Sequence, residues 1–128
     1  MILLDTHAWI WWVTESRRLS PRARRAINDA DAIGVSPLSC WEVAMLVQKG
    51  RIGLTLDVQE WVDHALQRPG VQLVPLDPAI AVQAALLPGQ LPGDPIDRFL
   101  AATCRAFEIP LVTKDQSLQA YPLIQAIW

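Results

Sequence analysis

Acidic residues in four regions of the chain have the type and spacing to bind a divalent cation. They are Asp5, Glu42, Asp94, Asp97 and Asp115. Carboxylate oxygens, with no cysteine or histidine among them, are the ligands that Mg²⁺ and Mn²⁺ prefer. Carboxylates that crowd together repel one another, and a bound cation removes that repulsion. Such clusters often serve phosphate chemistry, because the cation activates water and neutralises charge on phosphoryl oxygens.

Four of these acids also have a structural explanation at the starts of predicted helices. Ser39 and Glu42 have the spacing of a capping box, which would place Glu42 in the first helical turn. Asp94 and Asp115 fit helix N-caps, and Asp97 would lie in a first turn, where the helix dipole favours an acid. A carboxylate at a helix start can also bind a cation, so both roles stay open.

Asp5 differs from the other four acids, because it closes a short apolar strand and no capping role is evident for it. In open α/β sheets, functional sites lie outside the carboxyl ends of the strands. Asp5 lies at such an end, and Asp115 lies just past the end of another predicted strand. We therefore expect the acids to converge on one edge of the sheet.

The elements that would position these acids alternate between short apolar strands and helices. We expect strands at residues 2–4, 31–36, 71–74 and 109–113, with an edge strand at 123–127. We expect helices at residues 6–14, 21–29, 39–49, 57–67, 78–87 and 95–107, and a short one from 115 to about 121. This alternation predicts an α/β fold with a mainly parallel sheet of four to five strands and helices on both faces.

The composition is that of a globular protein with one domain. The chain has 128 residues, of which 52% are hydrophobic and 19% are charged, and its formal net charge is −2. These values predict a single domain over residues 1–128 and exclude a disordered chain. We expect no membrane span and no signal peptide, because no apolar run is long enough and the N-terminus lacks a basic region. Two cysteines without redox or metal spacing favour a reduced, cytoplasmic location.

Two further features of the sequence concern its partners. The mean hydropathy of +0.21 is high for a small monomer, so we expect a partner or a second copy to cover part of the surface. Five of the eleven basic residues lie within positions 17–25. That run fits either a solvated helix face or an edge that contacts phosphate groups.

Four segments form an ordered set of acidic motifs. They read Leu-Leu-Asp-Thr-His-Ala-Trp at 3–9, Ser-Pro-Leu-Ser-Cys-Trp-Glu-Val-Ala at 36–44, Asp-Pro-Ile-Asp-Arg at 94–98 and Leu-Val-Thr-Lys-Asp at 111–115. In this order, and over essentially the whole chain, they resemble the motifs of PIN-domain proteins, especially the VapC-type toxins of toxin–antitoxin pairs. One such motif alone would be weak, whereas four in register are specific.

The resemblance implies a PIN-like three-layer α/β/α sandwich and an endoribonuclease that depends on Mg²⁺ or Mn²⁺. It implies in-line attack of water on an RNA phosphodiester, which leaves a 5′-phosphate and a 3′-hydroxyl. It also implies a homodimer and inhibition by a cognate antitoxin protein that binds near the site. Carried over by position, the catalytic acids and metal ligands are Asp5, Glu42, Asp97 and Asp115, with Asp94 as an auxiliary ligand.

Other residues receive weaker assignments from the resemblance. Thr113 matches a small hydroxyl residue near the last acid, and Lys114 and the arginine run are candidates for phosphate contacts. Trp9, Trp11 and Trp12 fit an antitoxin contact, although packing in the core or in a dimer explains them equally well. The loop at 91–93 lacks the histidine and basic residue that the family often carries there, which bears on substrate contacts more than on metal binding.

Three alternatives compete with this interpretation. A phosphatase with an aspartyl nucleophile would carry a second aspartate two residues after Asp5, where this chain has His7. A signalling receiver domain could use Thr113 and Lys114 but would lack the other acidic motifs. The alternative that is not an enzyme is a PIN scaffold that binds RNA or protein without cleavage. The chain has no P-loop, dinucleotide-binding or nucleophile-elbow motif.

Overall fold

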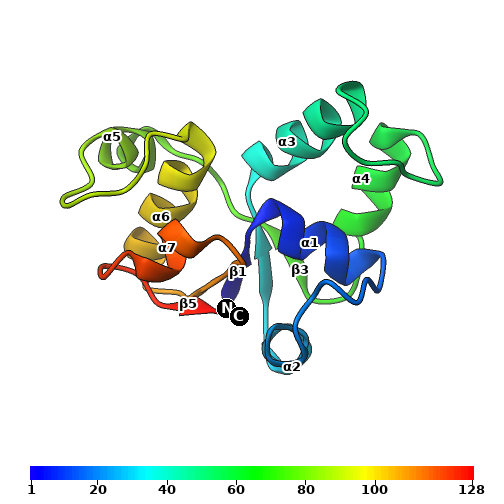
Figure 1. The fold of residues 1–128 in the computed structure, drawn as a ribbon, viewed down its shortest axis with the longest axis horizontal. Helices are drawn as coiled ribbons and strands as arrows, with labels where there is room; N and C mark the ends of the chain where they lie inside the picture. Colours follow the sequence, from blue (N-terminus) through cyan, green and yellow to red (C-terminus); the bar gives the residue numbers. More distant parts are fainter.

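Parallel strands form the centre of the computed structural model, which describes all residues 1–128 (Figure 1). The strands lie in the order β3-β2-β1-β4-β5, and every neighbouring pair is parallel. The strands are β1 (Ile2–Leu4), β2 (Ile33–Val35), β3 (Val71–Leu73), β4 (Leu111–Val112) and β5 (Ala126–Ile127). The helices are α1 (Thr6–Val13), α2 (Pro21–Asp29), α3 (Pro37–Gln48), α4 (Val58–Leu66), α5 (Pro78–Ala85), α6 (Pro95–Phe107) and α7 (Gln116–Ala120).

The sheet lies between two helical layers, because successive residues of each strand point to opposite faces. Leu4 of β1 and Val35 of β2 pack in one core with residues of α1 to α4. Leu3 of β1 and Leu111 of β4 pack in a second core with residues of α5 to α7. The two groups of helices lie on opposite sides of the strands in Figure 1. The predicted three-layer α/β/α sandwich is confirmed.

The order of the strands places a crevice beside the central strand. The chain first adds β2 and β3 on one side of β1, and then returns to add β4 and β5 on the other side. Such a reversal creates a crevice at the carboxyl ends of the strands, here β1 and β4, where ligands of α/β proteins commonly bind. Asp5 and Thr113 directly follow the ends of these two strands.

The predicted elements are all present; β1 has its predicted bounds, and the other four strands are shorter than predicted. The strand predicted at 31–36 spans Ile33–Val35. Helix α3 begins at Pro37, two residues before its predicted start, because Ser36 rather than Ser39 is the N-cap. Proline at the first helical position carries no N–H, so it fits there without losing a hydrogen bond.

The cysteines and the helix lengths complete the description of the fold. Cys40 and Cys104 are both free, and they lie in different helical layers. Burial raises the pKa of the Cys104 thiol to about 12, so this side chain serves packing rather than thiolate chemistry. None of the helices combines the length and the apolar character needed to cross a membrane.

Candidate active site

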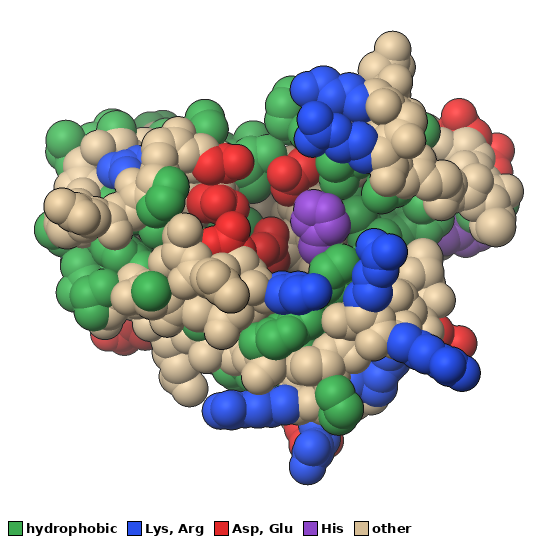
Figure 2. Space-filling view, in the orientation of Figure 1, with side chains coloured by type: hydrophobic (Ala, Val, Ile, Leu, Met, Phe, Trp, Pro, Cys, Tyr) green, Lys and Arg blue, Asp and Glu red, His purple; other side chains and the backbone are tan.

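A cavity of about 570 Å³ opens at the carboxyl ends of β1 and β4, with walls from α1, α3, α6 and α7. Figure 2 shows acidic side chains gathered in a central hollow, with a histidine beside them and basic side chains around it. The cavity is lined by Asp5, His7, Trp11, Arg18, Glu42, Asp94, Asp97, Lys114, Asp115 and Gln116. All five acids predicted from the sequence therefore line one cavity.

Asp5 is the most buried of these acids, with 9% of its surface exposed. Its Oδ1 accepts a hydrogen bond from the Thr6 backbone N–H at 2.6 Å, and its Oδ2 accepts one from the Thr113 hydroxyl at 2.6 Å. Asp5 is thus the N-cap of α1, a role that the sequence analysis did not expect. Burial raises the pKa of Asp5, and the hydrogen bonds from Thr113 and Thr6 oppose this rise.

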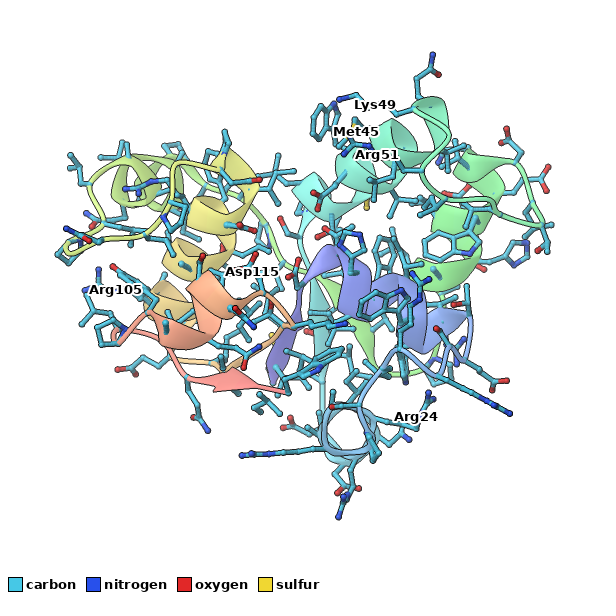
Figure 3. The ribbon with its side chains drawn as sticks, in the orientation of Figure 1. Arg24, Met45, Lys49, Arg51, Arg105 and Asp115 are labelled. Atoms are coloured by element: carbon cyan, nitrogen blue, oxygen red, sulfur yellow. The ribbon has the colours of Figure 1, made fainter.

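Thr113 connects two of the acids. It is fully buried, its Oγ1 donates to Asp5, and the same oxygen accepts a hydrogen bond from the Asp115 backbone N–H at 3.0 Å. Asp115 in turn caps α7, because its Oδ1 accepts from the Leu118 backbone N–H at 3.0 Å. Figure 3 shows Asp115 where α7 begins. One hydroxyl group therefore fixes the positions of Asp5 and Asp115 relative to each other.

Glu42 lies in the second turn of α3, so the predicted capping box with Ser39 is wrong. Because the helix begins at Pro37, Ser39 is already inside it, and its buried hydroxyl accepts a hydrogen bond from the Thr6 hydroxyl at 3.0 Å. Burial raises the pKa of the half-buried Glu42, while the Thr6 hydroxyl lowers it. With the capping role removed, contact with the cavity is the remaining explanation for this acid.

Asp94 and Asp97 come from the start of α6. Asp94 caps the helix as predicted, since its Oδ1 accepts hydrogen bonds from the backbone N–H groups of Ile96 at 2.9 Å and Asp97 at 3.3 Å. The half-buried carboxylate of Asp97 accepts no hydrogen bond from a protein group. Burial, followed by the charges of the four other cavity acids, raises the pKa of Asp97 to about 7. A carboxyl group with such a pKa is typical of functional sites.

The cavity acids fit a hydrated divalent cation. They provide only oxygen donors, and they lie close enough for their charges to raise the pKa of Asp97. No three His, Cys, Asp or Glu side chains form a preformed cage around one point. Mg²⁺ usually keeps several water molecules and takes one or two carboxylates directly, so it needs no such cage. The donor set therefore suits Mg²⁺ or Mn²⁺ better than zinc.

Basic and aromatic residues line the same cavity beside the acids. Lys114 and Arg18 supply two cations to the cavity, and their role as phosphate contacts stays a prediction. His7 and Trp11 come from consecutive turns of α1, and their ring centroids are 5.6 Å apart. His7 is a cavity residue that was not predicted from the sequence. Its spacing of four residues from Trp11, on the helix that follows Asp5, is the signal that could have found it.

The tryptophan cluster of α1 divides between the core and the cavity. Trp9 has no exposed surface, and its ring lies 5.1 Å from that of Trp61. Trp12 is 8% exposed, and its indole N–H donates to Asn28 Oδ1 at 3.2 Å. Packing in the core thus explains Trp9 and Trp12, whereas Trp11 lines the cavity.

The arginine run divides in a similar way. Arg18 lines the cavity. The guanidinium group of Arg24, labelled near α2 in Figure 3, donates to the Ser16 backbone carbonyl at 3.0 Å, which is a structural contact. Arg22 and Arg25 are exposed on α2. A phosphate-contacting role is therefore best supported for Arg18 within this run.

Comparison with known proteins agrees with this geometry. The PIN domain family model matches residues 2–123. The curated Ribonuclease VapC22 of Mycobacterium tuberculosis is 37% identical over 129 aligned positions, which cover 99% of this chain and 98% of that protein. A toxin-antitoxin complex from Klebsiella pneumoniae has a similar chain with a TM-score of 0.70 and 18% identity, over 97% of this chain and 95% of that one. VapBC2 from Rickettsia felis, bound to a DNA fragment from their promoter, has a similar chain with a TM-score of 0.68 and 15% identity. The alignment covers 98% of this chain and 97% of that one.

Proposed function

The chain belongs to the PIN-domain family, and on this basis we propose that it is a ribonuclease toxin of the VapC type that cleaves RNA at the acidic cavity. The observation that carries this proposal is the arrangement of five carboxylates, from four regions of the sequence, around one cavity. The raised pKa of Asp97 supports this proposal. No protein cation contacts that carboxylate, so its repulsion by the other acids is left for a bound cation to relieve.

We propose that the cavity works with Mg²⁺ or Mn²⁺. Asp5, Asp97 and Asp115 would hold the cation, with Asp94 as an auxiliary. When bound, the cation would supply an activated water and neutralise charge on the phosphoryl oxygens. The protein's contribution is to fix Asp5 and Asp115 through Thr113 and to line the cavity with carboxylates and no cysteine.

The other residues of the cavity act on the RNA and on water. Glu42 is half-buried and lines the cavity, and its carboxylate would orient the attacking water or accept a proton from it. Lys114 and Arg18 are exposed and would contact phosphate groups on either side of the cleaved bond. Lys49 and Arg51, which lie near the end of α3 in Figure 3, add positive charge on the same face.

We further propose that an antitoxin protein inhibits this chain in the cytoplasm. Structural neighbours of the chain are toxin–antitoxin complexes, which supports such a partner. An apolar groove of about 440 Å³ adjoins the acidic cavity and includes Leu38, Met45, Phe99 and the exposed Trp41. A partner seated there would bury apolar surface and block access to Glu42 and Asp94, which line both hollows. The homodimer stays a prediction.

Cleavage of RNA by the protein freed of any partner tests the proposed function. Total RNA is incubated with Mg²⁺, with Mn²⁺ and with EDTA, and the wild type is compared with Asp97→Asn. We expect cuts at few positions with either metal, no cuts with EDTA, and a loss of at least about 100-fold in the variant. Cleavage that persists in EDTA or in the variant would contradict the metal-dependent mechanism. Specific RNA binding without cleavage would favour the scaffold alternative.

A further inference from the structure

Aromatic side chains from distant parts of the chain meet beside the acidic cavity. The rings of His7 and Trp11 are 5.6 Å apart and inclined at 54°. The centroid of the Trp128 ring lies 5.8 Å from that of the Trp11 ring, and the planes of the two rings are inclined at 57°. Trp128 therefore packs beside Trp11, and His7 lies two residues after Asp5, the N-cap of α1.

This aromatic surface is accessible from the cavity. His7 is exposed, Trp11 is partly exposed, and both line the cavity. The Lys114 ammonium group lies over the Trp11 ring, 5.7 Å from its centroid. Lys114 is exposed, so the side of the Trp11 ring beneath its ammonium group faces the cavity. Trp11 and Trp128 also pack against the core that contains Trp9 and Trp12, which holds the Trp11 ring in place while part of it stays exposed.

The charges around the rings select the class of ligand. Lys114 and Arg18 lie on the cavity wall with His7 and Trp11, while the five carboxylates line the rest of the cavity. The cavity wall thus has an aromatic, a basic and an acidic part. A matching ligand would place a flat ring on the first, an anion near the second and a phosphodiester near the third. A nucleotide within an RNA strand has this combination, and aromatic rings bind bases of any sequence by stacking.

We infer that His7 and Trp11 form a stacking site for the nucleobase next to the cleaved phosphodiester, an inference that rests on the proposed ribonuclease function. The base takes the place of the Lys114 ammonium over the ring, and that ammonium contacts the neighbouring phosphate. The faces of a base are covered within a duplex, so this site requires a single-stranded or splayed nucleotide. The aromatic pair would thus favour unpaired RNA, a preference that the carboxylates alone would not provide.

The test measures RNA binding in an Asp97→Asn background, so that cleavage does not interfere. Two labelled probes are titrated in Mg²⁺ by fluorescence anisotropy: a short single-stranded RNA, and an abasic ribose-phosphate oligomer of equal length. Trp11→Leu should weaken binding of the RNA by about tenfold and leave binding of the abasic oligomer unchanged. Trp11→Phe should restore most of the affinity. Phe107→Leu is the matched control, because Phe107 is an exposed aromatic residue that lines neither the cavity nor the apolar groove, and this variant should bind both probes normally.

Exposed His7 provides a second variant in case Trp11→Leu does not fold. His7→Ala should weaken RNA binding about threefold and His7→Tyr should not, with unchanged thermal unfolding for both. The inference is wrong if these variants leave RNA binding unchanged, or weaken both probes equally. It is also wrong if the Trp11 and His7 variants impair only the binding of an antitoxin protein. If the parent binds neither probe, the proposed function fails as well.

Discussion

The two sides of the acidic cavity hold their carboxylates in different ways. On the sheet side, formed by Asp5, Thr113 and Asp115, each carboxylate accepts at least one hydrogen bond that fixes its position. On the helix side, formed by Glu42 and Asp97, the carboxylates are half-buried, and that of Asp97 accepts no hydrogen bond from the protein. Burial raises the pKa of both, as it does for Asp5, but at Asp97 no hydrogen bond opposes the rise. The sheet side is thus assembled by the fold itself. On the helix side, the other carboxylates repel the charge of Asp97, and a proton or a bound cation would relieve that repulsion.

This difference predicts opposite effects on stability from two variants that both abolish activity. Asp97→Asn removes a charge that the fold disfavours, so we expect higher stability without metal at pH 7.5. Asp5→Ala leaves the Thr113 hydroxyl and the Thr6 N–H without an acceptor, so we expect a loss of about 1–3 kcal/mol. RNA cleavage should fall at least about 100-fold in each. Urea unfolding and a cleavage assay measure the two effects, and equal destabilisation by both variants would contradict the comparison.

Substitution of Thr113 would remove hydrogen bonds of the sheet side without removing an acid. Thr113→Val keeps the shape but removes the donor to Asp5 and the acceptor for the Asp115 N–H, so we expect a loss of about 1–3 kcal/mol and reduced cleavage. Thr103→Val is the matched control, since the buried Thr103 hydroxyl bonds only within its own helix, to the Phe99 carbonyl at 2.8 Å. That variant should keep full activity. Similar activities for the two variants would show that Thr113 does not position the site.

The helix side should control how stability depends on pH. Asp97 has a pKa of about 7 when folded against an ordinary value of 3.8, so the folded state holds a proton that the unfolded state has released. The stability of the protein without metal should therefore fall as the pH rises from about 4 to about 7, and level off above. Asp97→Asn should flatten this slope. Urea unfolding in EDTA across this pH range measures the slope of stability against pH. A slope that the variant leaves unchanged would contradict the assignment of this pH dependence to Asp97.

The smallest effect is expected at Asp94, which has a capping role and an exposed carboxylate. Asp94→Asn keeps an acceptor for the Ile96 and Asp97 N–H groups, so stability should change little and activity should fall a few-fold. Asp94→Ala removes the cap as well and should cost about 1 kcal/mol. Thermal unfolding and cleavage rates separate the two roles. A full loss of activity in Asp94→Asn would make Asp94 a main acid rather than an auxiliary one.

The fold and the five acids could be predicted from the sequence because their signals are local. Apolar strands alternate with helices, and acids follow strand ends or begin helices, as Asp5, Asp94 and Asp115 do. The start of α3 was misplaced because Ser36 and Ser39 are equally good caps in isolation. Tertiary packing decided between them, since Ser39 is buried against Thr6.

The contacts that join distant segments could not be predicted in the same way. The hydrogen bond from Thr113 to Asp5 spans 108 positions, and no local pattern encodes it. The division of the tryptophans likewise depends on which face of α1 meets α4, through the contact of Trp9 with Trp61. The meeting of Trp11 with Trp128 depends on the place of β5 at the end of the sheet.

Calorimetric titration with Mg²⁺ tests most directly whether a cation relieves the repulsion on the helix side. The titration is made at pH 6.5 in two buffers of different ionisation enthalpy, with the wild type and Asp97→Asn. Because the pKa of Asp97 is about 7, we expect the wild type to bind Mg²⁺ and release well over half a proton per ion. The variant should release fewer protons, because only Asp5 and Glu42 then keep a raised pKa. Binding without proton release, or no binding by a folded protein free of partners, would contradict the account.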